Sequence, residues 1–107
     1  MKLDCCDSPR LGQVRHLVAR AKRDLYLKRC GCGAWWVHEE EDIWMGEDDI
    51  EYDTFGRLED AEAEALRATD DPLSVDLGPR RAFERRGTFE TELEDWTPRD
   101  ILVARRG

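Results

Sequence analysis

Four cysteines are the residues of this 107-residue chain best suited to chemistry, and they occur as two short-spaced pairs. Cys5 and Cys6 are adjacent, whereas Cys30 and Cys32 flank a single glycine. A structural zinc ion is held in a tetrahedron of four ligands, which the fold usually brings together as two such pairs. We therefore predict a zinc site formed by Cys5, Cys6, Cys30 and Cys32.

The spacing of both pairs departs from the usual C-x₂₋₄-C pattern, and this leaves alternatives open. Adjacent side chains tend to diverge, so Cys5 and Cys6 could supply one ligand between them, with His16 or His38 completing the set. The cysteines could also be free buried thiols, which are common in the cores of proteins from reducing compartments. A redox role is least favoured, because no Cys-x-x-Cys turn at a helix N-terminus is present to lower a thiol pKa.

The second cysteine pair lies in the stretch LKRCGCGAWW, which predicts a β-hairpin with thiols at its tip. Leu25–Arg29 alternates like a half-buried strand, Ala34–His38 is rich in aromatic and β-branched residues, and the glycines between them permit a tight turn. Alternation along the second strand places Trp35 on one face and Trp36 on the other. Over Leu25–Glu40 this order of strand, cysteine turn and strand resembles a zinc ribbon, which implies a structural metal.

The segments around the hairpin predict a single α+β domain over residues 1–107, with an antiparallel sheet of three to five strands. Ser8 and Pro9 suit the N-cap and the first position of a helix, and apolar residues then recur at helical spacing. We therefore predict an N-terminal helix from about Pro9 to Arg23. A second helix is predicted at Glu59–Ala68, where strong helix formers dominate.

The remaining elements are shorter, and each is predicted from local alternation or from turn and capping residues. They are strands at Ile43–Met45 and Ile50–Phe55 around a turn at Gly46–Asp49, a strand at Leu73–Leu77, and a short closing helix at Thr97–Ala104. Residues 89–96 fit a strand and a helix equally well.

Charge is distributed unevenly along the chain, whose formal net charge is −8. Residues 39–76 carry 16 acidic and 2 basic side chains. A segment this acidic repels a phosphate backbone and attracts a basic protein surface, so we expect a basic protein partner rather than nucleic acid. The plain alternative is a solvated acidic face that keeps the protein soluble. Aromatic residues ringed by charge suit an interface, and here they predict contacts at Trp44, Asp48, Asp49, Glu51 and Tyr52.

Small size, strong acidity and aromatic residues within the acidic run resemble, in general character, the immunity proteins of bacterial toxin systems. That resemblance implies a non-enzymatic protein that neutralises a basic nuclease toxin by covering its active site. The competing hypothesis is a zinc-ribbon-type regulatory protein that contacts nucleic acid through arginines of its basic N-terminal helix, such as Arg15 and Arg20.

Catalysis has little support in the sequence, which contains two histidines and no glycine-rich phosphate loop. Asp49, Glu51 and Asp53 alternate as at the start of an EF-hand loop, but Thr54 replaces the glycine required at the sixth position. We therefore expect these acids to form a solvated ladder on one strand face. No apolar run is long enough to span a membrane and the N-terminus lacks a secretory signal, so we expect a cytoplasmic protein without a small-molecule substrate.

Overall fold

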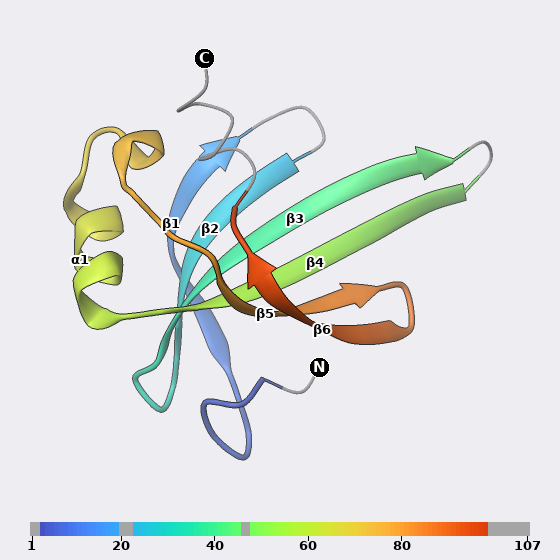
Figure 1. Ribbon diagram of the computed structural model, residues 1–107, viewed down its shortest axis with the longest axis horizontal. Coiled ribbons are helices and arrows are strands. Elements are labelled where there is room, and N and C mark those ends of the chain that lie inside the picture. The colour runs from blue at the N-terminus through green and yellow to red at the C-terminus, as the bar shows by residue number, and fades with distance from the viewer. Residues whose placement is uncertain (1–2, 20–22, 46–47, 99–107) are drawn as a thin grey trace.

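The computed structural model describes residues 3–19, 23–45 and 48–98, which form one antiparallel sheet of six strands with a single α-helix (Figure 1). The strands lie in the order β1-β2-β3-β4-β5-β6, so each one pairs with its neighbours along the chain. In chain order the elements are β1 (Leu11–Ala19), β2 (Arg23–Cys30), β3 (Trp35–Met45), β4 (Asp48–Leu58), α1 (Asp60–Ala68), the 3₁₀ turn η1 (Pro72–Ser74), β5 (Arg80–Arg86) and β6 (Phe89–Trp96).

The predicted fold class is wrong: six strands and one α-helix replace an α+β domain with two helices and three to five strands. The predicted N-terminal helix is also wrong, because most of Pro9–Arg23 is strand β1. Register shifts between Gln13 and Arg15 and between His16 and Val18 interrupt the pairing of β1 with β2. Such β-bulges break the two-residue alternation of a strand, and the apolar residues around them imitated a helical spacing.

The predicted hairpin at the second cysteine pair is confirmed. β2 and β3 pair from Arg29 opposite Trp35 outward, and the backbone N–H of Cys30 donates to the carbonyl of Ala34 at 2.8 Å. Gly33 has a φ of 101°, a conformation that residues with a Cβ rarely adopt. The glycine therefore allows the turn to close and fixes the cysteines at its tip.

The two faces of the sheet carry separate buried clusters, as the alternation of Trp35 and Trp36 predicts. The helix-side face is covered by α1. The cluster between them includes Leu25, Leu27, Trp35 and Val37 of the sheet, Ala63 and Leu66 of α1, and Leu77. The cysteine-side face is centred on fully buried Trp36 and includes Leu3, Cys30, Ala34, Phe55 and Phe83. The N-terminal segment packs over one end of this second face and thereby brings Cys5 and Cys6 to the hairpin tip.

The predicted helix at Glu59–Ala68 is confirmed as α1, with Glu59 as its N-cap and Glu62 completing a capping box. At the other end of α1, the guanidinium of Arg15 donates from β1 to the carbonyls of Leu66 at 2.8 Å and Thr69 at 2.6 Å. Arg15 therefore caps a helix, so the nucleic-acid hypothesis loses both its basic helix and this arginine.

Other local predictions had mixed outcomes. The strands around Ile43 and Ile50 are confirmed within β3 and β4, which pair as far as Met45 opposite Asp48. The strand predicted at Leu73–Leu77 is wrong, since this segment begins in the 3₁₀ turn η1. Residues 89–96 form a strand, β6, and most of the predicted closing helix lies outside the described residues. Within the described part of the chain, no helix has the length and apolar character needed to cross a membrane.

Candidate metal centre

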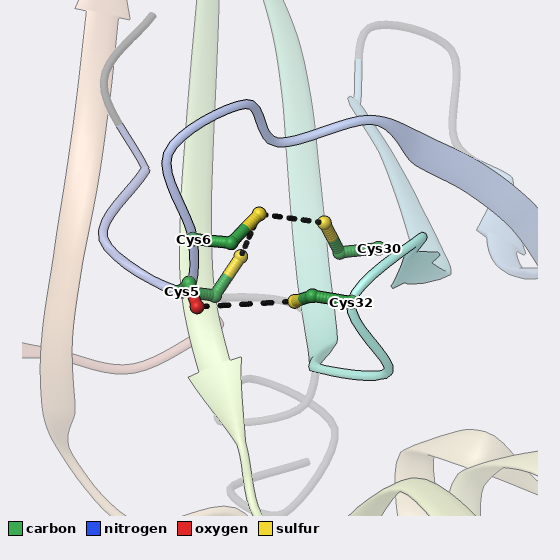
Figure 2. A group of neighbouring side chains, drawn as sticks. All are labelled: Cys5, Cys6, Cys30 and Cys32. Carbon is green, nitrogen blue, oxygen red and sulfur yellow. Dashed lines mark hydrogen bonds between the residues drawn. The ribbon is translucent and has the colours of Figure 1, made fainter.

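The four cysteine sulfurs converge at the tip of the β2–β3 hairpin (Figure 2). All four Sγ atoms lie within 4.8 Å of one another, with Cys6 Sγ 3.7 Å from Cys30 Sγ and 4.0 Å from Cys5 Sγ. In a tetrahedral zinc site with Zn–S bonds of about 2.3 Å, neighbouring sulfurs are about 3.8 Å apart. These spacings fit four ligands of one ion and are far too long for disulfides.

The adjacent cysteines both contribute a sulfur, although sequence reasoning left open that they supply only one ligand. The chain bends through Asp4–Ser8, and this turns both thiols toward the hairpin tip, as Figure 2 shows. The histidines considered as substitutes are engaged elsewhere, since His16 Nε2 is 2.9 Å from Asp24 and His38 Nε2 is 2.8 Å from Asp53. The four cysteines are therefore close enough to hold a metal ion without either histidine.

Backbone N–H groups stabilise negative charge on the sulfur of Cys30, which lies at the end of β2. The backbone N–H groups of Cys32 and Arg10 donate to this sulfur and lower the pKa of Cys30 to about 6. The effect of Cys32 is the larger of the two. The Arg10 nitrogen is 3.4 Å from the sulfur. Donors of this kind favour the thiolate, which is the form that binds metal.

The pKa of Cys5 moves in the opposite direction, to about 12, because burial and then the neighbouring Cys30 and Cys32 disfavour a second negative charge. Burial likewise raises the pKa of Cys6. Four thiolates cannot be held so close together without a cation, whereas a divalent ion would offset their repulsion. The chemistry of the cluster, like its geometry, is suited to metal binding.

Of the five residues predicted to contact a partner, the structure describes the side chains of Glu51 and Tyr52. Glu51 is exposed, whereas its neighbour Tyr52 is half-buried with the guanidinium of Arg86 4.5 Å from its ring centroid. Successive residues of a strand point to opposite faces, so the side chains of Glu51 and Tyr52 lie on opposite faces of the sheet. The side chains of the other predicted contacts lie outside the described part of the structure; these are Trp44, Asp48 and Asp49.

Sequence reasoning missed a polar cluster on the cysteine-side face. Asp53 was expected in a solvated ladder, but it is only 5% exposed and accepts a hydrogen bond from His38, which is 4% exposed. Burial would raise the pKa of Asp53, but the hydrogen bond and charge of His38, together with Arg85, outweigh it and lower that pKa. The pKa of Glu40 is raised by burial and then by the charges of Glu51 and Asp53. The alternation of Trp36, His38 and Glu40 along β3 was the available signal for this cluster.

Comparison of the chain with protein-family models, curated proteins and solved structures finds no match. Function is therefore argued from the two clusters themselves.

Proposed function

We propose that Cys5, Cys6, Cys30 and Cys32 hold one structural zinc ion in a non-enzymatic protein-binding domain. The observation that carries this proposal is the convergence of four sulfurs at tetrahedral spacing. Structural zinc sites use four protein ligands, whereas catalytic ones keep a position open for water or substrate. Four thiolates suit a borderline-soft ion such as Zn²⁺ and leave it no open position.

The proposed ion would act as a clasp between the N-terminal segment and the β2–β3 turn. Outside the sulfurs, three contacts among the described residues hold the N-terminal segment. They are the hydrogen bond from the Gly31 N–H to the Arg10 carbonyl at 3.0 Å, the exposed ion pair of Asp4 with Arg81 at 3.4 Å, and the packing of Leu3 against the cluster around Trp36. So few contacts give a short segment little stability of its own. Zinc would hold the segment in place and keep Trp36 covered.

Elemental analysis of the purified protein tests the clasp directly. We expect one tightly bound zinc per chain after dialysis, and loss of that zinc in Cys30→Ser. Ser8→Ala should keep full occupancy, because it retains the backbone hydrogen bond from Ser8 to the Cys6 sulfur. Removing the ion with a chelator should expose Trp36 and shift tryptophan emission to longer wavelength. Zinc-free protein from zinc-supplemented cells, or zinc retained in Cys30→Ser, would contradict the proposal.

The partner we infer is a basic protein, and the role that fits best is that of an immunity protein neutralising a basic toxin. Support comes from the acidic run, residues 39–53, which lies along the long β3–β4 hairpin. Asp42 and Glu51 lie opposite each other on this hairpin, and both are exposed. Their charges would speed the association of a basic partner in a salt-dependent way.

The inferred role can be tested with the purified product of any adjacent gene that encodes a basic protein. Binding should weaken as salt is raised, and it should be lost when Asp48, Asp49 and Glu51 are replaced by lysine. Glu94→Lys changes an exposed acid on β6, outside the acidic run, and is the matched control. Equal binding by the triple variant and the control would count against the acidic hairpin as the contact surface.

A further inference from the structure

A second set of ligating side chains lies on the cysteine-side face, away from the four cysteines. His38 and Glu40 alternate along β3, and Asp53 of β4 lies directly opposite Glu40 in the strand register. One potential ligand atom from each residue falls within 4.8 Å of the other two, and His38 Nε2 is 2.8 Å from Asp53 Oδ1. Two ligands at right angles on one ion, with bonds of 2.0–2.2 Å, are separated by about 3.0 Å. The set is therefore close to coordination geometry.

The His38 and Asp53 side chains are held in place before any ion binds. The His38 ring stacks on Phe55 with centroids 4.2 Å apart and an interplanar angle of 10°, and Tyr26 flanks its other side at 5.5 Å. His38 and Asp53 are almost fully buried, whereas Glu40 is half-buried and leaves one approach from solvent. Ligands on paired strands with locked side chains make a preorganised site.

One nitrogen of the buried His38 imidazole lacks a hydrogen-bond partner in the described part of the chain. That atom, Nδ1, is itself buried. A neutral imidazole has one donor and one acceptor nitrogen. If Nε2 carries the proton, the lone pair of Nδ1 is unpaired; if Nδ1 carries it, the lone pair of Nε2 faces carboxylate oxygens. A cation between Nε2 and the carboxylates makes the second arrangement favourable at Nε2, while Nδ1 lacks a partner among the described residues in either arrangement.

The excess of negative charge around His38, Glu40 and Asp53 also favours the binding of a cation. Glu40 and Asp53 are like charges directly opposite each other, an arrangement that destabilises a sheet. A metal-bound imidazole is neutral. With His38 neutral, the neighbouring charges that act on these two residues are those of two acids and two cations: Asp24, Glu51, Lys28 and Arg85. The acids, including the pair itself, therefore exceed the cations by two charges, which one divalent ion would balance.

We propose that His38, Glu40 and Asp53 form a second cation site that takes a divalent first-row transition ion. An imidazole with two carboxylates favours Mn²⁺, Fe²⁺ or Zn²⁺, whereas Mg²⁺ and Ca²⁺ favour ligand sets made only of oxygen. Three protein ligands leave coordination positions open, in contrast to the closed set of four cysteines. The site is independent of the cysteines, because it shares no ligand with them.

Titration with Mn²⁺ of protein that carries one equivalent of zinc, which the four thiolates take first, tests this site. Binding is followed by the loss of the free-ion electron paramagnetic resonance signal. Mn²⁺ does not displace Zn²⁺ from thiolates, so it reports the second site alone. We expect one bound Mn²⁺ per chain. Glu40→Gln and Asp53→Asn each remove a direct ligand, so each should lower the affinity by at least the roughly 10- to 100-fold that loss of an outer-shell partner costs. Excess Mg²⁺ should compete poorly.

Two controls separate this site from general attraction and from the cysteines. Asp42→Asn removes an exposed carboxylate from the same face of β3 and should leave Mn²⁺ affinity unchanged. Cys32→Ser should lower the zinc content and leave Mn²⁺ affinity unchanged. The absence of bound Mn²⁺, or equal weakening by Asp42→Asn and Glu40→Gln, would overturn the proposal whatever the zinc content is.

Discussion

Replacing Gly56 by alanine should destabilise the protein through a clash with one aromatic ring. Gly56 lies on β4 between Val37 and Ala82, and the ring of Trp96 covers it. A Cβ at position 56 would overlap Trp96 Cζ3 and lie 2.9 Å from its Cε3, closer than real Cβ contacts come. The indole is rigid and packs against the helix-side core, so the ring must move as a unit.

Overpacking of this kind costs about 1–3 kcal/mol. For a domain of this size, each kcal/mol shifts the melting temperature by about 4–8 °C, so the expected decrease is about 5–20 °C. Thermal and urea unfolding of Gly56→Ala measure it. Gly12→Ala is the matched control, because its new Cβ would meet nothing closer than the Arg29 carbonyl at 3.9 Å.

A double variant tests the cause assigned to this loss. Trp96→Leu alone should destabilise the protein by removing packing, but it should also make room for a Cβ at position 56. The combined loss in Gly56→Ala/Trp96→Leu should therefore be smaller than the sum of the two single losses. A Gly56→Ala protein as stable as the Gly12→Ala control, or strict additivity in the double variant, would refute the reasoning.

Three further predictions concern charged groups, and urea unfolding measures each. Arg15→Gln removes charge-assisted hydrogen bonds to the last carbonyls of α1 and should cost about 1.5–3 kcal/mol, with only partial recovery in Arg15→Lys. The lowered pKa of Asp53 means that its contribution is present above the unfolded-state pKa and is lost as pH falls through the folded-state value; Asp53→Asn should therefore flatten the loss of stability below about pH 4. The raised pKa of Glu40 has the opposite sign, because the folded protein gains stability as pH falls through it. Glu40→Gln should therefore raise the urea midpoint at neutral pH without added metal; an unchanged or lower midpoint would show that the repulsion is already compensated.

Local features of the sequence predicted only part of the local structure. The Cys-Gly-Cys-Gly turn and the helix at Glu59–Ala68 depend on glycine conformation, capping and helix propensity, which are read within a few residues. The prediction of a helix where the structure has β1 failed because the bulges of β1 bury Leu17 and Val18 in succession and leave Val14 43% exposed. Only the pairing of β1 with β2 explains this pattern. β5 (RRAFERR) is dominated by charged residues and lacks the apolar alternation by which a strand is recognised, and β6 is mostly exposed and fits a strand and a helix equally well.

The two candidate sites differ in how far the sequence could reveal them. Cysteine is rare and chemically distinctive, so four of them predicted a cluster even with unusual spacing. The cluster around His38 depends on the register between β3 and β4, which no local pattern specifies. A slip of one residue would move Asp53 to the helix-side face and abolish the cluster. Common residues that meet only through register require the structure.

Among the strands that the structure describes, β1 and β6 are the edges of the sheet, and the backbone groups of an edge strand can pair with another copy of the chain. The two edges are protected by different means. Bulges distort β1, whereas β6 carries a row of exposed acids: Glu90, Glu92, Glu94 and Asp95. Distortion is insensitive to solution conditions, but charge is neutralised by acid and screened by salt. Aggregation at low pH or high salt should therefore begin at β6, where the protection against self-association is purely electrostatic.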